Sequence, residues 1–255
     1  MIPLKNLAFC AFLALLPAVV SAQSFSDNFT GTDGDSLGSA WNQGNAANLE
    51  IQGNQAVPVL PDGVSSFDPS VFGLDPSVAS IEDPTDFSIS VDFTTTGGSL
   101  VGIWFQGRDD VASNDQSDAS GYAIRFRSTD GYLQAINFNG GTAVTAYYWN
   151  STVTPNTTLF NETDVFRMTV SSGLLANDVD VIVESITSNV TVVAATMTRS
   201  NKNTGGSVGD AFGLYVGSVA GVTFDNFTAT VPEPQNYALC IGGGMALLVL
   251  ARRRR

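Results

Sequence analysis

Short runs of alternating apolar and polar residues fill residues 23–230, and no segment there keeps a 3.6-residue period. Alternation with a period of two places every second side chain on one face, as in a strand with one buried face. Clusters of Gly, Asn, Asp, Ser and Pro separate the runs, and such clusters form turns. The pattern predicts eleven strands: Leu49–Val59, Phe87–Thr96, Leu100–Arg108, Tyr122–Ser128, Tyr132–Asn139, Ala143–Trp149, Val165–Ser171, Val179–Ile186, Val190–Thr198, Phe212–Gly217 and Val222–Thr230.

Strands that follow one another without helices pair antiparallel, so the sequence predicts an all-β fold packed as a sandwich or jelly roll. Two insertions, Pro58–Pro84 and Asp109–Ser120, are rich in Asp, Ser and Pro and are predicted to be loops.

The composition of the predicted β domain, residues 23–230, excludes several classes of function. The domain carries six cations and 23 acids, a net charge of −17. Because nucleic acid requires a basic surface, this charge argues against nucleic-acid binding. Histidine is absent from the chain, which excludes every mechanism that needs an imidazole base or ligand. Both cysteines, Cys10 and Cys240, lie in the terminal segments, so the domain has no disulfide.

Strand alternation also predicts one polar face. In "SLVGIWFQGR", Val101, Ile103 and Phe105 share one side and the intervening residues share the other. In "YAIRFRS" the two arginines oppose the apolar residues in the same way. Aromatic faces beside planar guanidinium donors suit sugar rings and uronate carboxylates. The alternative is an outer sheet face whose arginines pair with the many carboxylates. The candidate ligand-binding residues are Trp104, Gln106, Arg108, Arg125, Arg127, Tyr147 and Trp149, with Arg167 expected on the same side.

Residues 1–22 are predicted to be a signal peptide. Lys5 precedes an apolar run from Leu7 to Val20, and Val20-Ser21-Ala22 is a small-x-small cleavage site. The mature chain is therefore expected to begin at Gln23.

The domain resembles the laminin-G and concanavalin-A-like jelly-roll group. The resemblance rests on "SFSDNFTGTDGDSLGSAWNQ", on "FSISVDFTTTGGSLVGIWFQGRDD" with "GYAIRF", and on "GGSVGDAFGLYVGSVAGVTFDNFTAT". It implies that the first and last strands are neighbours and that Phe29 and Phe227 point into the core. Some members bind calcium through oxygen ligands. The candidate ligands for a structural calcium ion are Asp27, Asp33, Asp35 and Asp225.

Glycosidases of the same group carry Glu-x-Asp-x-x-Glu or Glu-x-Asp-x-Glu on one strand. The nearest match here is "DVDVIVE", with Asp178, Asp180 and Glu184 on one side of the strand. The match begins with Asp instead of Glu, and its last spacing is one residue too long. A glycosidase is therefore the alternative, and a non-enzymatic protein is expected.

The C-terminus, residues 231–255, resembles the PEP-CTERM sorting signal of Gram-negative bacteria. It contains Pro232-Glu233-Pro234, a predicted transmembrane helix over 237–251, and a terminal cluster of Arg252, Arg253, Arg254 and Arg255. The fourteen uncharged residues from Ala238 to Ala251 span about 21 Å as a helix, less than the ~30 Å hydrocarbon core. The arginines would remain cytoplasmic.

This resemblance implies recognition by an exosortase, which cuts near the PEP motif. The chain would cross the inner membrane, remain there as a single-pass protein, and reach the cell surface or exopolysaccharide matrix after cleavage. The expected function is carbohydrate binding or a structural role in the matrix. A scaffold without a defined ligand remains a further alternative.

Overall fold

The computed structural model describes residues 22–42, 48–60, 70–75, 78, 86–96, 98–107, 121–139, 142–143, 147–148, 160–174, 178–198, 211–217 and 221–232. Gln23–Val231 form one compact unit. Within the described ranges the secondary structure is entirely β, and none of these residues belongs to a helix long and apolar enough to cross a membrane. Except for Ala22, the predicted signal peptide lies outside the described residues, as does the predicted helix 237–251.

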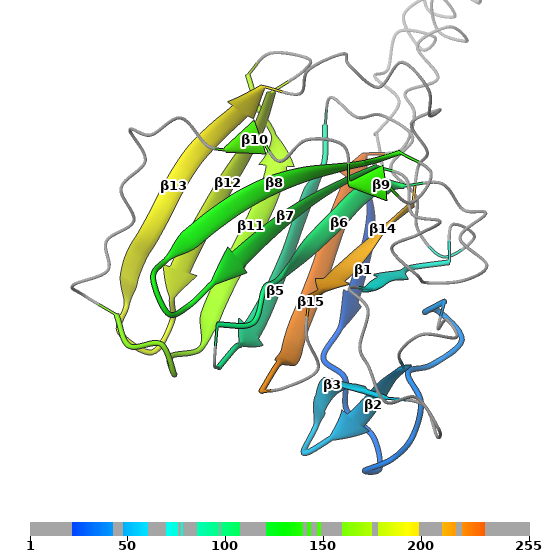
Figure 1. Cartoon of the computed structure of the whole chain (residues 1–255). Helices are drawn as coiled ribbons and strands as arrows, with labels where there is room; N and C mark the ends of the chain where they lie inside the picture. Colours follow the sequence, from blue (N-terminus) through cyan, green and yellow to red (C-terminus); the bar gives the residue numbers. More distant parts are fainter. Residues whose placement is uncertain are drawn as a thin grey trace, which may run out of the picture. The chain divides into compact units, whose positions relative to one another are not determined.

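Two antiparallel sheets face each other (Figure 1). The eight-stranded sheet has the order β13-β12-β11-β5-β15-β3-β2, and β1 also pairs with β15. Its strands are β13 (Val190–Thr198), β12 (Asp178–Ser185), β11 (Phe166–Ser172), β5 (Ser88–Thr94), β15 (Thr223–Pro232), β3 (Gln55–Val59), β2 (Asn48–Gln52) and β1 (Ala22–Asp27).

The seven-stranded sheet has the order β10-β8-β7-β6-β14-β4, and β9 also pairs with β8. Its strands are β10 (Tyr147–Tyr148), β8 (Tyr132–Asn139), β7 (Gly121–Arg127), β6 (Val101–Gly107), β14 (Ala211–Val216), β4 (Ser70–Gly73) and β9 (Thr142–Ala143). The predicted all-β antiparallel sandwich is therefore confirmed.

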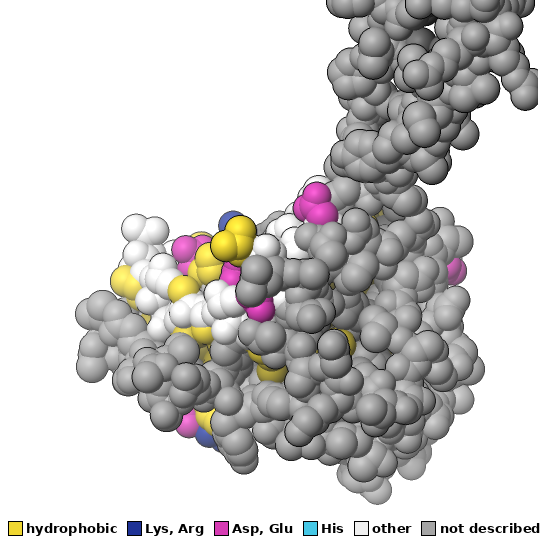
Figure 2. Space-filling model, turned by 90° about the horizontal axis from the view of Figure 1, so that it is seen from above, with side chains coloured by type: hydrophobic (Ala, Val, Ile, Leu, Met, Phe, Trp, Pro, Cys, Tyr) yellow, Lys and Arg dark blue, Asp and Glu magenta, His cyan; other side chains and the backbone are white. Residues whose placement is uncertain are grey.

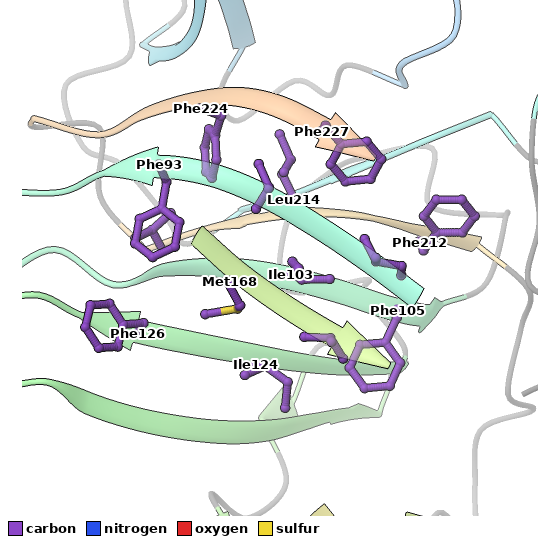
Figure 3. Packing of buried hydrophobic residues seen from close by; sticks show 14 of the residues in the cluster. Phe93, Ile103, Phe105, Ile124, Phe126, Met168, Phe212, Leu214, Phe224 and Phe227 are labelled. Carbon is purple, nitrogen blue, oxygen red and sulfur yellow. The ribbon is translucent and has the colours of Figure 1, made fainter. Parts of the chain in front are cut away.

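The main core lies between the two sheets. Phe93 and Met168 from the eight-stranded sheet point toward Ile103 and Phe126 from the seven-stranded sheet (Figure 3). These residues occupy alternate positions of their strands, so the period of two in the sequence produces the buried face directly. Burial of each such side chain contributes about 1.5–3 kcal/mol relative to exposure, and no disulfide is needed in this part of the chain.

The first and last strands are neighbours, as the resemblance implies, because β1 pairs with β15. Phe29 and Phe227 are both buried in the main core. Trp41 packs between them, with ring centroids 5.7 Å from Phe29 and 5.0 Å from Phe227. The expectation that both phenylalanines point inward is confirmed.

Two sequence-based strand assignments need correction. The single strand expected over Leu49–Val59 is a hairpin, because Gly53 and Asn54 have positive φ angles of 60° and 59° and form a two-residue turn. The loop expected over Pro58–Pro84 contains β4, which pairs with β14. The second predicted loop, Asp109–Ser120, lies outside the described residues.

Candidate functional site

The side of the seven-stranded sheet that faces away from the main core carries the candidate ligand-binding residues. Val101, Ile103 and Phe105 of β6 belong to the main core, whereas Trp104 belongs to a second, smaller hydrophobic cluster. The predicted alternation of β6 over these residues is therefore confirmed. We call this side the arginine face and define it by Trp104, Arg125, Arg127, Gln134 and Tyr215.

Trp104 is on the expected side of the sheet but is only 1% exposed, so its ring is not open to a ligand. Its indole lies against Gly107 of the same strand and Gly73 of β4. A Cβ atom at Gly107 would lie 1.6 Å from Trp104 Cζ2, and one at Gly73 would lie 3.2 Å from Cζ3. Alternation predicts the side of a sheet that a residue occupies, but not whether a further layer buries it. Trp104 therefore lies on the predicted side of the sheet, within a buried cluster.

Arg125 makes three contacts with neutral partners on the arginine face. Its Nε donates to Gln134 Oε1 at 2.6 Å, and its Nη2 donates to the same oxygen. Its Nη1 donates to the Tyr215 hydroxyl at 2.9 Å, and its Cζ lies 5.8 Å from the centroid of the Tyr215 ring. The guanidinium therefore connects β7 with β8 on one side and with β14 on the other.

Gly102 makes this arrangement possible. In register, Tyr215 pairs with Gly102, Gly102 pairs with Arg125, and Arg125 pairs with Gln134. Because the position between Tyr215 and Arg125 has no side chain, the guanidinium can reach across β6 to the Tyr215 hydroxyl. A Cβ atom at Gly102 would lie 1.8 Å from the carbonyl oxygen of Ile124, which rules out any other residue without a shift of the backbone.

The two polar neighbours of Arg125 are buried. Gln134 is 4% exposed, and Tyr215 is fully buried. Burial raises the pKa of Tyr215, and the nearby Arg125 charge and its hydrogen bond offset part of that increase. Tyr215 therefore stays neutral at physiological pH and contributes a dipole, not a charge, to the site.

Arg127 lies two residues after Arg125, on the same side of β7, and its charge is balanced by a nearby carboxylate. It binds Asp130 through two hydrogen bonds, Nε–Oδ1 at 3.0 Å and Nη2–Oδ2 at 2.6 Å. Its Cζ lies 4.9 Å from the centroid of the Tyr132 ring. The hydrogen bond from Arg127 lowers the pKa of Asp130, so the pair is charged at neutral pH. The side chain of Arg127 is 35% exposed, which leaves it within reach of a ligand.

Of the other four predicted members of this site, two lie in described strands and two lie outside the described residues. Gln106 lies in β6 between Phe105 and Gly107, at the point where the register of β6 with β14 shifts. Tyr147 pairs with Ala135, a residue of the main core, so the register does not place it in the row of Gln134. Arg108 and Trp149 lie outside the described residues.

The expectation that Arg167 shares this face is wrong. Arg167 lies in β11 of the eight-stranded sheet, where it binds Asp92 with Nε–Oδ1 at 2.6 Å and Nη2–Oδ2 at 2.8 Å. Asp92 is 4% exposed and also accepts a hydrogen bond from Asn226 Nδ2 at 3.0 Å. The hydrogen bond to Asp92 raises the pKa of Arg167. An outward residue of a sandwich strand can belong to either sheet, and alternation alone does not distinguish them.

The predicted calcium ligands are not brought together. The described part of the chain contains no group of three or more His, Cys, Asp or Glu side chains that could hold a metal ion. Asp27 accepts hydrogen bonds from the backbone nitrogen of Phe29 and from Trp41 Nε1, both at 2.8 Å. Both carboxylate oxygens of Asp27 therefore accept hydrogen bonds that stabilise the fold.

The remaining three carboxylates have local partners as well. Asp33 Oδ1 accepts the backbone N–H of Gly53 at 2.7 Å, which holds the β2–β3 turn. Asp35 Oδ2 accepts the backbone N–H of Thr32 at 3.3 Å. Asp225 Oδ1 accepts the N–H of the next residue at 2.7 Å. These contacts are those of turn and strand-end acids.

The candidate catalytic acids lie on β12. Asp178 is 8% exposed, and Asp180 accepts a hydrogen bond from Thr196 Oγ1 at 2.5 Å. Glu184 is exposed and pairs in register with Arg167 of β11. Retaining glycosidases need carboxyl groups about 5 Å apart, and inverting ones about 6.5–9.5 Å. The glycosidase alternative therefore rests on the sequence match alone.

Two residues of the arginine face, Gln134 and Tyr215, were missed by the sequence analysis, as was Tyr132 beside Arg127. The segment "YLQAINFN" alternates, so Tyr132 and Gln134 could have been assigned to one side of their strand. Tyr215 lies in "AFGLYV", where all six residues are buried. An uninterrupted apolar run indicates a strand covered on both faces, which is the signal for the second cluster.

No known family and no curated protein matches this sequence. Among solved structures, the chain is similar to the basic winged bean lectin with Tn-antigen, at 9% identity and a TM-score of 0.53, covering 84% of this chain and 100% of that chain. It is also similar to the lectin UEA-II complexed with galactose, at 11% identity and a TM-score of 0.51, covering 81% of this chain and 97% of that chain.

A third similar structure is the winged bean acidic lectin complexed with methyl-α-D-galactose, at 8% identity and a TM-score of 0.51, covering 84% of this chain and 100% of that chain. At such low identity the likeness concerns the fold and not the ligand. The chain therefore has the concanavalin-A-like jelly-roll fold of legume-type lectins.

Proposed function

We propose that this protein is an exported, non-enzymatic carbohydrate-binding protein and that its arginine face holds the glycan. The observation that carries the proposal is the pair of partly exposed guanidiniums, Arg125 and Arg127, on one face of a lectin-like sandwich. Arg127 stacks on Tyr132, and an aromatic ring beside a planar donor suits the face and hydroxyl groups of a sugar. Two of the lectin structures that share this fold are complexes with galactose and with methyl-α-D-galactose, which supports the same class of ligand here.

The test is binding of the purified full chain to a panel of neutral and acidic polysaccharides by affinity electrophoresis. We expect retardation in at least one gel and a clear loss of retardation when Arg125→Ala is combined with Arg127→Ala. An unchanged melting temperature of the double variant provides the control for folding. Absence of retardation by every polysaccharide would favour a scaffold without a ligand, and release of sugar products would favour the enzyme.

We further propose that the C-terminal segment directs the chain to an exosortase in the inner membrane, and that cleavage releases it to the cell surface or exopolysaccharide matrix. The order Pro232-Glu233-Pro234, apolar segment and arginine cluster supports this. Replacing both prolines by alanine is expected to keep the full-length chain in the membrane fraction of an exosortase-containing host. Normal cleavage of that variant would contradict the proposal.

Structural calcium is a separate proposal that rests on the family resemblance. Its test is the melting temperature of the full chain with calcium and with a chelator. Equal melting temperatures would contradict it.

A further inference from the structure

One of the described arginines differs from the others in the charge of its partners. The described residues include three cations, Arg125, Arg127 and Arg167. Arg127 pairs with Asp130 and Arg167 with Asp92, whereas Arg125 makes no ion pair within the described part of the chain. The domain has 23 acids, and Figure 2 shows acidic side chains at several places on the described surface. Carboxylates are abundant in this domain, yet the half-buried guanidinium of Arg125 has neutral partners. Its surroundings therefore differ from those of the other two described arginines.

The hydrogen bonds of Arg125 leave part of the guanidinium unused. An arginine side chain has five N–H groups and no acceptor. Three of them donate to Gln134 and Tyr215, and one N–H on each of Nη1 and Nη2 has no acceptor among the described residues. A charged group that is half-buried loses solvation, and neutral hydrogen bonds compensate that loss only in part.

Gln134 adds a second donor at the same place. Because a guanidinium can only donate, the carbonyl oxygen of Gln134 must face Arg125, and its NH₂ group remains as a second donor beside it. Gln134 is 4% exposed, and its Nε2 donates to no acceptor in the described ranges. A buried amide that leaves its donors unused is uncommon, since most buried polar groups have partners.

The remaining N–H groups of Arg125 and Gln134 indicate which charge a ligand must carry here. The unused groups at Arg125 and Gln134 are all donors, and one of them carries a positive charge. A ligand that complements them must offer acceptors and negative charge, and a carboxylate provides both. Neutral sugar hydroxyls would satisfy the hydrogen bonds but not the charge.

We propose that Arg125 and Gln134 form an oxyanion site that recognises the carboxylate of a uronic acid unit in an acidic polysaccharide. This inference rests on the proposed function and specifies its ligand class. Gly102 is a positioning residue in this site, because its missing side chain lets Arg125 lie between Gln134 and Tyr215. A sulfate ester presents related acceptors, so the two kinds of oxyanion must be separated by experiment.

The experiment measures affinity electrophoresis of the full chain in gels that contain polygalacturonate, sulfated dextran or neutral galactan. We expect the strongest retardation with polygalacturonate. Arg125→Met is expected to weaken that binding on the order of tenfold to a hundredfold, as for the loss of charge-assisted hydrogen bonds. Arg125→Lys, which keeps the charge but not the planar fork, is expected to recover only part of the affinity.

The matched control is Arg127→Met. It removes the same charge from the same face, but from an arginine that Asp130 already compensates, so its effect on polygalacturonate binding is expected to be several-fold smaller. Gln134→Leu is expected to weaken binding of polygalacturonate while leaving the charge of the face unchanged. Near-ultraviolet circular dichroism of each variant verifies that the fold is intact.

The outcomes separate this inference from the proposed function. Equal binding of polygalacturonate and neutral galactan, or unchanged polygalacturonate binding by Arg125→Met, would overturn the oxyanion site while carbohydrate binding stands. Preference for sulfated dextran would overturn the assignment to a carboxylate. Absence of binding to all three polysaccharides would count against both proposals.

Discussion

The indole nitrogen of Trp41 donates a hydrogen bond to Asp27 Oδ2 at 2.8 Å, while Oδ1 of the same carboxylate accepts the backbone N–H of Phe29. Phe29 has a φ angle of 49°, in a region that non-glycine residues rarely adopt. The carboxylate therefore holds a strained backbone and a core tryptophan at the start of the domain.

Replacing Asp27 by Ala is expected to reduce the free energy of unfolding by about 2–3 kcal/mol, since two partly buried donors lose a charged acceptor. Urea denaturation followed by tryptophan fluorescence measures this. Asp35→Ala provides the control, because Asp35 is exposed and its side chain accepts a long hydrogen bond of 3.3 Å from Thr32; a change within about 0.5 kcal/mol is expected there. Equal effects of the two substitutions would contradict the role given to Asp27.

The second prediction concerns the Asp92–Arg167 pair. Arg167→Met leaves the buried carboxylate of Asp92 with the hydrogen bond from Asn226 but without its cation. Because the side chain of Arg167 is 44% exposed, we expect a loss of about 2–4 kcal/mol, below the largest values for fully buried pairs. The double variant Asp92→Asn with Arg167→Met is expected to recover part of this loss, because it removes the uncompensated charge. A double variant as unstable as the sum of the single ones would contradict coupling between the two residues.

The third prediction concerns acid stability. Burial raises the pKa of Asp164, but hydrogen bonds from Ser185 and Ser188 outweigh that effect and keep the pKa below its ordinary value. A carboxyl whose pKa is lower in the folded state stabilises the protein at pH values above the unfolded value of about 3.9. That contribution is lost as the pH falls through the folded pKa.

Ser185→Ala is therefore expected to destabilise the protein at pH 7, and the difference from the parent is expected to shrink as the pH falls below the folded pKa of Asp164. Urea titrations at several pH values measure it, with the exposed Ser26→Ala as control. A difference that stays constant down to acidic pH would show that Ser185 acts without the charge of Asp164.

The fourth prediction concerns Gly102. Gly102→Ala would place a Cβ atom 1.8 Å from a backbone oxygen of the neighbouring strand, so the sheet must shift. We expect a loss of more than about 3 kcal/mol, at the upper end for overpacking. Gly38→Ala is the matched control, because a Cβ atom there would meet nothing within 4 Å. Similar urea midpoints for the two variants would contradict the close approach at Gly102.

The fifth prediction concerns ionic strength. A domain with a net charge of −17 repels a polyanion at long range, and salt screens this repulsion more than it screens a half-buried contact. The affinity for polygalacturonate is therefore expected to rise between about 10 and 150 mM salt. Non-specific attraction would give the opposite trend, so a steady fall in affinity over this range would contradict a local oxyanion site.

Much of the fold follows from the sequence because alternation is a local property. The strands β8 and β13 have the predicted bounds, since each runs uninterrupted between turn residues. The β2–β3 hairpin was missed although Gly53 and Asn54 form a two-residue turn of the type that hairpins favour. β4 was missed because four residues inside a polar segment carry little periodic signal.

The candidate site follows from the sequence only in part. Alternation predicted that Arg125 and Trp104 face the same side, but sheet order decides which strands are neighbours, and this order depends on long-range pairing. Arg167 was therefore assigned to the wrong sheet. The contact between Arg125 and Tyr215 joins residues 90 positions apart, and no local pattern contains it. The burial of Trp104 likewise depends on other strands.

β15 has a consequence for the order in which the chain can fold. It is the strand through which β1, β2 and β3 join β5 and the rest of the eight-stranded sheet. The N-terminal strands therefore complete their sheet only when residues some 170 to 200 positions later have been synthesised. Loop closure over such a distance is slow, and a chain that folds late remains extended during synthesis. Until β15 has left the ribosome, the domain cannot complete its sheet and stays unfolded. A translocation channel that accepts only unfolded chains could therefore take the chain up during its synthesis.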